Sequence, residues 1–278
     1  MTDERLPSFD LVVATVDRVE ELGRLLDSLD AQTHRDFRVL LIDQNGDDRI
    51  EPIVGERAFD VVRLHAERGL SRARNAALGE IHADLVAFPD DDCTLAPDLL
   101  AEVARRLSAN LDGLTGRAVD ETGRSASSWA QTPAMLTREN LWNRAISFTI
   151  FLRASLVARV GRFDEELGLG AESRWASGEE IDYLIRALAT GARIEYDPDV
   201  VVTHPNKRFS SAALRSLGSR DGASIGYILR KHAYSKRVVG RMFLRPIGGA
   251  LLAFVRRDRA QAAFQLSTLR GRLLGYRR

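Results

Sequence analysis

The feature that most constrains the fold is an alternation, over residues 10–107, of short apolar runs rich in β-branched residues with helix-like segments. This order is typical of parallel βαβ units. Apolar spacing predicts a helix after the first strand, with Asp17 as its N-cap and Glu20 three residues later, and further helices at Ser71–Gly79 and from Pro97. The predicted strands are Asp10–Thr15, Arg38–Asp43, Val61–His65 and Leu85–Phe88.

The regular pattern loosens after Leu107 and ends near His204. In this second stretch a helix is predicted at Glu179–Thr190, before Gly191. Beyond Pro205 the sequence is mainly helical. We therefore predict an α/β domain over residues 1–204 and a basic helical extension over residues 205–278. The remaining predicted strands are Ser147–Arg153, Arg193–Tyr196 and Val200–Thr203, and the predicted C-terminal helices are Ala212–His232 and Ala260–Leu274.

The formal net charge of +1 hides a large asymmetry. From Pro205 onward there are 17 Lys and Arg but two acids, Asp221 and Asp258, whereas the chain as a whole has 40 basic and 39 acidic residues. A basic tail on an acidic body suggests that the tail meets an anionic partner. The alternative is that these arginines solvate the helices and pair with the acidic body.

The sequence also indicates where the protein works. The N-terminal stretch MTDERLPSFD has charges where a secretory signal needs apolar residues. The longest uncharged apolar run of the C-terminal part, Pro246–Val255, is roughly half of what a membrane span needs. A single cysteine, Cys93, excludes an intrachain disulfide and a CxxC metal site. We therefore expect a cytoplasmic protein.

Three adjacent carboxylates, Asp90–Asp92, come directly after the fourth predicted strand. Ligands of open α/β sheets bind at the carboxyl ends of the strands. A divalent cation would relieve the repulsion between these side chains, and oxygen ligands suit Mg²⁺ or Mn²⁺. The alternative is an Asp-rich turn that caps the helix starting near Pro97.

Other strand ends carry side chains that a nucleotide requires. Thr15 and Asp17 follow the first strand, and Asp43 ends the second, where a carboxylate can accept from a base or a ribose hydroxyl. Arg68, Arg72 and Arg74 precede or enter the helix after the third strand and could face a diphosphate. The sequence has neither GxGxxG after the first strand nor GxxxxGK[ST], so neither a dinucleotide fold nor a P-loop is supported.

A second acidic cluster spans Ser177–Asp182. It fits a capping box followed by an ordinary ion pair, but a carboxylate held at a helix N-terminus also suits a general base. His204, after the last predicted strand, is either a metal ligand or a histidine closing a strand edge. Trp175 either stacks on a sugar ring or packs in the core.

Together these segments resemble the family 2 glycosyltransferases, which are inverting enzymes of the GT-A fold. The resemblance covers most of residues 8–205 and depends on the order of several motifs. The segments that carry it are Val12–Arg18, Ile42–Asn45, Arg68–Asn75, Ala87–Asp92, Val160–Glu165 and Gly178–Asp182.

The resemblance implies a Rossmann-like, mixed and mostly parallel sheet with flanking helices. It also implies roles for individual residues. Asp90 and Asp92 fall on the two acids of the DxD motif, and His204 falls where family members place a histidine near the metal and the diphosphate. Glu180, in place of the commoner Asp, falls on the expected catalytic base, with Glu179 and Asp182 as competitors. The residues implied on the donor side are Thr15, Asp17, Asp43, Arg68, Arg72, Asp90 and Asp91; those on the acceptor side are Trp175, Glu179 and Asp182.

The function implied is a hexosyltransferase reaction that needs Mn²⁺ or Mg²⁺. A nucleoside-diphosphate sugar is the donor, and a saccharide or lipid-linked saccharide of cell-surface polysaccharide synthesis is the acceptor. The alternatives are a non-catalytic nucleotide-sugar-binding scaffold and a nucleotidyltransferase. The basic C-terminal helices are expected to contact an anionic membrane surface at the inner face of the membrane or to mediate homodimerisation, and nothing matches a nucleic-acid-binding module.

Overall fold

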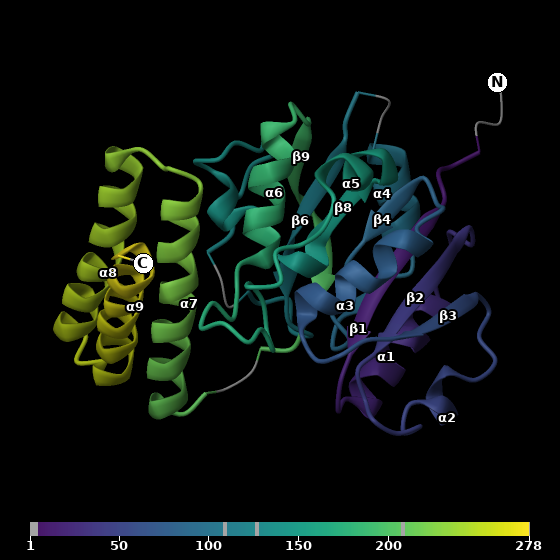
Figure 1. The fold of residues 1–278 in the computed structure, drawn as a ribbon, viewed down its shortest axis with the longest axis horizontal. Coiled ribbons are helices and arrows are strands. Elements are labelled where there is room, and N and C mark those ends of the chain that lie inside the picture. The colour runs from purple at the N-terminus through teal and green to yellow at the C-terminus, as the bar shows by residue number, and fades with distance from the viewer. Residues whose placement is uncertain (1–4, 108–109, 126–127, 207–208, 278) are drawn as a thin grey trace. The chain divides into compact units, whose positions relative to one another are not determined.

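The computed structural model describes residues 5–107, 110–125, 128–206 and 209–277. Within these ranges the chain forms two compact units (Figure 1). The first comprises residues 5–68, 72–163 and 183–206, and the second comprises residues 69–71, 164–182 and 209–277. The second unit therefore takes in two short segments that precede the C-terminal helices in sequence.

A mixed sheet of nine strands organises the described part of the first unit, in the order β3-β2-β1-β4-β8-β6-β9-β5 with β7 beside β9. The longer pairings, β1 with β2, β2 with β3 and β6 with β9, are parallel, while β8 runs antiparallel to β4 and β6. The predicted α/β class with C-terminal helices is confirmed. The strands are β1 (Phe9–Thr15), β2 (Phe37–Asp43), β3 (Asp60–His65), β4 (Leu85–Ala87), β5 (Thr94–Leu95), β6 (Gly113–Val119), β7 (Ala134–Met135), β8 (Ile150–Arg153) and β9 (Ile194–Thr203).

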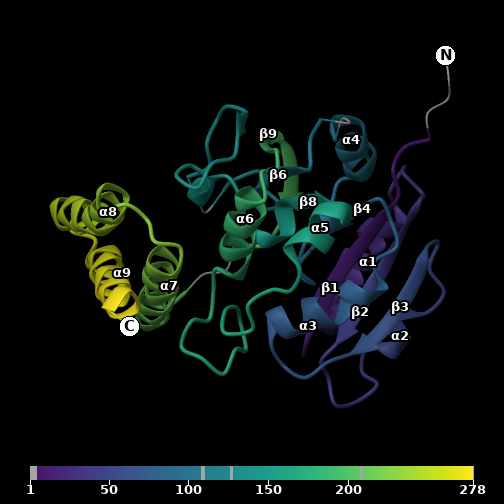
Figure 2. The same ribbon diagram turned by 45° about the horizontal axis from the view of Figure 1, so that its top comes forward.

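The helices up to residue 189 alternate with these strands (Figure 2). Helix α6 begins with residues of the second unit and continues with residues of the first. The helices are α1 (Val19–Asp30), α2 (Glu51–Val54), α3 (Leu70–Ala77), α4 (Leu99–Arg106), α5 (Ala154–Val160) and α6 (Glu179–Ala189), with 3₁₀ turns at Leu78–Glu80, Leu141–Asn143 and Ser147–Thr149.

The first strand and helix show why this sequence folds into layers. β1 is buried on both faces, as expected for a central strand flanked by parallel neighbours. The four leucines of α1 recur at helical spacing and are fully buried in the same core cluster as β1. Burying each such side chain contributes about 1.5–3 kcal/mol relative to exposure. These leucines are Leu22, Leu25, Leu26 and Leu29.

Three local predictions are wrong. The strand predicted at Ser147–Arg153 begins at Ile150, because Ser147–Thr149 form a 3₁₀ turn. Asp17 does not cap α1: its backbone has φ of 60°, the N-cap is Arg18, and the helix begins at Val19. The strands predicted at 193–196 and 200–203 are one strand, β9, which runs through Pro198. Proline is tolerated there because the pairing with β6 shifts register between Thr115 and Arg117, at a bulge.

Three long helices form most of the second unit: α7 (Ser211–Lys231), α8 (Lys236–Val255) and α9 (Arg259–Arg277) (Figures 1 and 2). The contact between α7 and α9 is lined by glycines. A Cβ added at Gly222 would overlap the backbone of Thr268, and one added at Gly275 would overlap the backbone of Ala223. Glycine therefore permits the two backbones to approach closely.

Among the described residues, α8 is the one helix long and apolar enough to cross a membrane by length and composition. The sequence prediction considered only the uncharged run Pro246–Val255. In the structure Pro246 lies inside α8, so the helix extends to twice that length.

Candidate functional site

The carboxylate run Asp90–Asp92 occupies a turn between β4 and β5. The backbone amide of Cys93 donates to the carbonyl oxygen of Asp90 at 3.1 Å, which closes the turn. Asp91 and Asp92 are buried, whereas Asp90 is partly exposed. Helix α4 begins later, at Leu99, with Asp98 as its N-cap residue. The structure therefore does not support the alternative in which this run caps the helix.

Asp90, Asp92 and His204 converge in the first unit. One potential ligand atom from each lies within 4.8 Å of the other two. His204 follows β9, and its Nε2 atom lies 3.0 Å from Oδ1 of Asp92. The imidazole ring stacks on Phe148, with ring centroids 4.7 Å apart and planes 5° apart. The sequence prediction that these three residues form a metal site is consistent with this geometry.

Two arginines offset the charge of the run. Arg18 places Nη1 2.6 Å from Oδ1 of Asp91 and 2.9 Å from Oδ2 of Asp92. On the other side, Nη2 of the buried Arg74 lies 3.4 Å from Oδ1 of Asp90. Burial raises the pKa of the Asp91 carboxyl, and the positive charge of Arg18 opposes that rise. The cluster is thus balanced by two cations, Arg18 directly before α1 and Arg74 in α3.

Aromatic rings and a hydroxyl fix the Asp90 side of the cluster. The guanidinium of Arg74 lies 5.8 Å from the ring centroid of Phe88 and 5.5 Å from that of Phe163. The hydroxyl of Ser147 donates to Oδ1 of Asp90 at 3.3 Å. Cation–π contacts of this kind stabilise a buried guanidinium. Asp90 is therefore oriented by groups that come from distant parts of the chain.

The donor set fits a divalent cation. Two carboxylate oxygens and one imidazole nitrogen are ligands that divalent cations take in proteins, and the carboxylates suit Mg²⁺ or Mn²⁺. Open positions would be left for water or phosphate oxygens. The buried thiol of Cys93 is not suited to metal binding, because burial raises its pKa well above the ordinary value, and the neighbouring aspartates raise it further.

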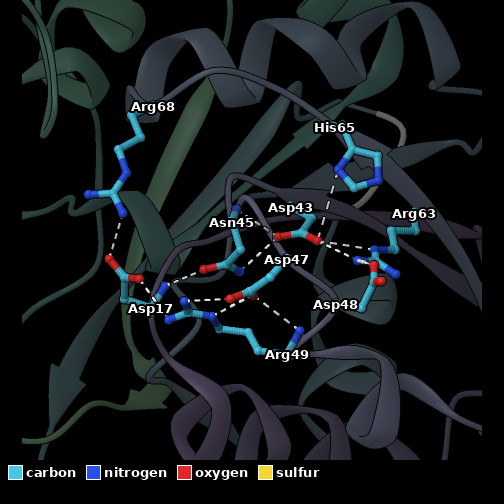
Figure 3. Close-up of polar contacts among 9 residues, drawn as sticks. All are labelled: Asp17, Asp43, Asn45, Asp47, Asp48, Arg49, Arg63, His65 and Arg68. Atoms are coloured by element: carbon cyan, nitrogen blue, oxygen red, sulfur yellow. Dashed lines mark hydrogen bonds and ion pairs between the residues drawn. The ribbon is translucent and has the colours of Figure 1, made fainter.

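Asp43 anchors a second polar cluster of the first unit, at the end of β2 (Figure 3). Its Oδ2 accepts from Arg63 at 2.7 Å, and its Oδ1 accepts from the side chain of Asn45 at 2.7 Å and from the backbone amide of Asn45 at 2.9 Å. Burial alone would raise the pKa of this carboxyl, but the hydrogen bonds from Asn45 and Arg63 leave it lowered. Asp43 is therefore held in the ionised form.

Asp17 joins this cluster from the other side (Figure 3). Its carboxylate accepts from Arg49 at 2.9 Å and from Arg68 at 2.8 Å, and its backbone amide donates to Asn45 at 2.8 Å. Asn45 thereby connects Asp17 with Asp43. Two more predicted donor residues lie in the same unit: Thr15 is buried at the end of β1, and Arg72 pairs with Glu67 at 3.0 Å.

The second acidic cluster lies in the second unit, in the first turn of α6. Asp182 is fully buried, and its Oδ1 lies 2.6 Å from Nζ of Lys231 and 2.8 Å from Nε2 of His232. Glu179 is also buried, whereas Glu180 is partly exposed. Of the three acids, Glu180 is thus the partly exposed residue, and its backbone is fixed in a helix.

Lys231 connects α6 to the segment before it. Its Nζ also lies 2.6 Å from Oδ2 of Asp164. Burial alone would lower the pKa of this ammonium, but the hydrogen bonds to Asp164 and Asp182 leave it raised. Trp175, predicted on the acceptor side, is buried and stacks on Tyr227, with ring centroids 5.0 Å apart. Its indole face is therefore occupied in part by another ring of the same unit.

The sequence patterns did not predict several residues of these clusters. Arg18 and Ser147 contact the carboxylate run, and Lys231 and His232 contact Asp182. Arg18 follows Asp17 within the first motif segment, so its position beside a strand end was a usable signal. Nothing in the sequence pairs the end of α7 with the start of α6, because the two lie 50 residues apart.

The family model for glycosyl transferase family 2 matches residues 10–162, more than half of the chain. The chain belongs to this family. The match covers β1 to α5, and therefore the carboxylate run and the Asp43 cluster. The resemblance predicted from the motifs is confirmed.

Curated relatives support the same membership. The pre-mycofactocin glycosyltransferase of Mycobacterium tuberculosis is 28% identical over 213 residues, which are 71% of this chain and 42% of that protein. The succinoglycan biosynthesis protein ExoM of Rhizobium meliloti is 26% identical over 245 residues, covering 82% of this chain and 77% of the relative. The chain thus spans less than half of the first relative and about three quarters of the second.

Solved structures share the fold. A mannosyltransferase of Pyrobaculum calidifontis, in complex with GDP-Man and Mn²⁺, aligns with a TM-score of 0.66 at 16% identity, over 98% of this chain and 88% of that one. Residues 1–349 of Staphylococcus aureus TarS align with a TM-score of 0.62 at 18% identity, over 95% and 92% of the two chains. The first unit accordingly has the predicted GT-A-type sheet.

Proposed function

We propose that this protein is a metal-dependent, inverting glycosyltransferase that uses a nucleoside-diphosphate sugar. The observation that carries the proposal is the convergence of Asp90, Asp92 and His204 within 4.8 Å, after a strand of the family's sheet. Three such donors match a divalent cation, and Mg²⁺ or Mn²⁺ sites with few carboxylates commonly also bind phosphates. The Mn²⁺ in the mannosyltransferase complex supports this choice of ion.

On the donor side, the first unit supplies binding groups for each part of a nucleotide. Asp43, kept ionised by Asn45 and Arg63, accepts a hydrogen bond from the base or the ribose. Arg68 and Arg72 provide positive charge for the diphosphate, and Asp17 orients Arg68. Asp90 and Asp92, with His204, would hold the cation, which when bound would offset the negative charge of the departing nucleoside diphosphate.

On the acceptor side, Glu180 is proposed as the general base. A base must be ionised and must have access to the acceptor hydroxyl, and Glu180 is the partly exposed acid of its cluster. It removes the proton as the hydroxyl oxygen attacks the anomeric carbon from the face opposite the nucleotide. The new glycosidic bond forms as the bond to the diphosphate breaks, which inverts the anomeric configuration.

The buried Glu179 and Asp182 are the weaker choices for the base. Glu179 packs beside Gly168, where an added Cβ would lie 3.3 Å from its carboxylate. Asp182 is neutralised by Lys231 and is removed from solvent. Both are proposed to shape the start of α6 on the acceptor side, together with Trp175.

The relatives suggest the acceptor class and the place of action. ExoM and ExoO are named for succinoglycan biosynthesis, so we propose a saccharide or lipid-linked saccharide acceptor in glycan synthesis. A lipid-linked acceptor would place the protein at the inner face of the membrane, with the basic C-terminal helices toward anionic lipid.

The test is a transfer assay with the purified chain, in which a panel of UDP-, GDP- and dTDP-sugars is incubated with candidate acceptors and Mn²⁺. Acceptor-dependent release of the nucleoside diphosphate, abolished by EDTA and restored by Mn²⁺, is the expected result. Binding of a nucleotide sugar with no release under any condition would favour the scaffold alternative. Release of pyrophosphate from a nucleoside triphosphate and a sugar phosphate would identify a nucleotidyltransferase instead.

A further inference from the structure

The three C-terminal helices have an unusual distribution of side chains. The contact between α7 and α9 is built from glycines, while large apolar side chains of α8 face outward. Val255 is 81% exposed, Leu244 65% and Leu251 62%. Monomeric soluble proteins rarely leave such side chains clustered on one face without a partner.

The exposed apolar side chains form one continuous stripe in the C-terminal half of α8. They recur at spacings of three, four and seven residues, which places them on one face of a helix. The opposite face, with Val238, Met242 and Pro246, is buried within the unit. The stripe consists of Leu244, Ile247, Leu251, Leu252, Phe254 and Val255.

Basic side chains border the stripe at both ends. Exposed Lys236, Arg237 and Arg241 precede it on α8, and exposed Arg256 and Arg257 follow it. Among the described residues from 209 onward, Asp258 is the one exposed acid. A second copy of this chain would bring the same positive rim against itself, which is unfavourable. An anionic partner with an apolar interior matches both the rim and the stripe.

Crossing a bilayer is a poorer fit for α8 than lying in its surface. Arg245 is the tenth of the 20 residues of the helix and is exposed, so a span would place it near the middle of the bilayer. A charged side chain is costly to place there, because the bilayer core cannot solvate it. A helix in the interfacial plane instead keeps its arginines at the headgroups and buries its apolar face in the acyl boundary.

We propose that the stripe of α8, bordered by these basic residues, inserts into the interface of an anionic membrane as a monotopic anchor. Burying the stripe removes apolar surface from water, and each arginine near anionic headgroups adds a favourable electrostatic contribution. This proposal specifies the membrane contact given under the proposed function and rests on it. Because vesicle binding needs no sugar transfer, its failure is distinguishable from a failure of the transferase proposal.

The experiment is co-sedimentation of the full chain with vesicles of 30% phosphatidylglycerol in phosphatidylcholine, and with vesicles of phosphatidylcholine alone. Wild type is expected to bind the anionic vesicles at least tenfold better. The double variant Leu251→Glu/Val255→Glu should lose most of this binding, and Arg237→Ser/Arg241→Ser should lose the preference for anionic lipid. Both pairs are exposed, so folding should be unchanged, which thermal unfolding checks.

Met135→Glu is the matched control, because it adds a carboxylate at an exposed apolar residue outside the stripe. It should bind vesicles like wild type. No binding of wild type to either vesicle, or equal binding by Leu251→Glu/Val255→Glu, would overturn the proposal. So would a wild-type dimer, seen by light scattering, that this double variant converts to a monomer, since a second copy would then cover the stripe.

Discussion

The two acidic clusters of this chain look alike in sequence but differ in what surrounds them. In the first unit Asp90 and Asp92 converge with His204. Arg18 pairs with Asp92 and Arg74 pairs with Asp90, which offsets the negative charge of the two acids. In the second unit the buried Asp182 is bound directly by Lys231 and His232. The first arrangement brings three potential metal ligands within 4.8 Å of one another, whereas the second uses its carboxylate to join α6 to the end of α7.

This difference shows that the role of an acidic residue depends more on the side chains around its carboxylate than on whether it is Asp or Glu. A buried acid paired with a lysine is costly to disrupt, because removing either partner leaves a buried charge. Acids that share a site with a histidine are suited to a metal. Within the second cluster itself, Glu180 is partly exposed while Glu179 and Asp182 are buried, which is why Glu180 is the proposed base.

The largest effect is expected from Glu180→Gln. This substitution removes the proposed general base and leaves the proposed donor-binding residues unchanged. Turnover should fall by about 10²–10⁴-fold, the range typical of a lost general base. Affinity for the nucleotide sugar should stay within about twofold, since the donor groups are untouched. Steady-state kinetics and donor titration measure the two quantities. Glu56→Gln, at an exposed residue outside the clusters, is the matched control and should keep full activity.

Asp182→Asn tests whether Asp182, in the same cluster, stabilises the fold. It leaves Lys231 with Asp164 as its charged partner, so the free energy of unfolding should fall by about 3 kcal/mol, the low end for a broken buried pair. Urea denaturation measures this loss. Glu180→Gln should change stability by no more than about 0.5 kcal/mol. Equal destabilisation by the two variants would remove the distinction between these acids.

A smaller, pH-dependent effect is expected at Asp43. Its pKa is lowered in the folded protein, so it adds stability above the unfolded pKa of about 3.9, and this stability is lost as the pH falls through the folded pKa. The difference in stability between wild type and Asp43→Asn should therefore shrink as the pH drops from about 5 to 2. Thermal unfolding over this range measures it. If the stability difference between wild type and Asp43→Asn did not change with pH, the ionised carboxylate of Asp43 would not be the source of that stability.

Local patterns predicted much of the fold. The alternation of strands and helices gave β1 to β4 within one or two residues, because each has a clear apolar period and turn residues at its ends. β6 was not predicted, since its glycines weaken the strand pattern, and one of them, Gly116, is needed where β9 approaches too closely for a Cβ. The bulge that admits Pro198 into β9 depends on that pairing and is invisible in a single segment.

The candidate metal ligands could be predicted from the sequence, but the residues that support them could not. Motif order pointed to Asp90, Asp92 and His204, and the structure brings these three together. The supporting residues were harder to predict, because Arg18 and Lys231 act through tertiary contacts over long sequence distances. The motif placed Glu180 on the expected base with Glu179 and Asp182 as competitors, and the structure adds that the two competitors are buried.

The central claim is that Asp92 belongs to a metal site for a nucleoside diphosphate. The most direct measurement is a thermal-shift panel of UDP, GDP, dTDP and CMP, each with and without Mn²⁺, on wild type, Asp92→Asn and the exposed control Asp36→Asn. One nucleotide should raise the Tm only with Mn²⁺, in wild type and Asp36→Asn but not in Asp92→Asn. No shift with any nucleotide, or a shift that survives in Asp92→Asn, would contradict the account.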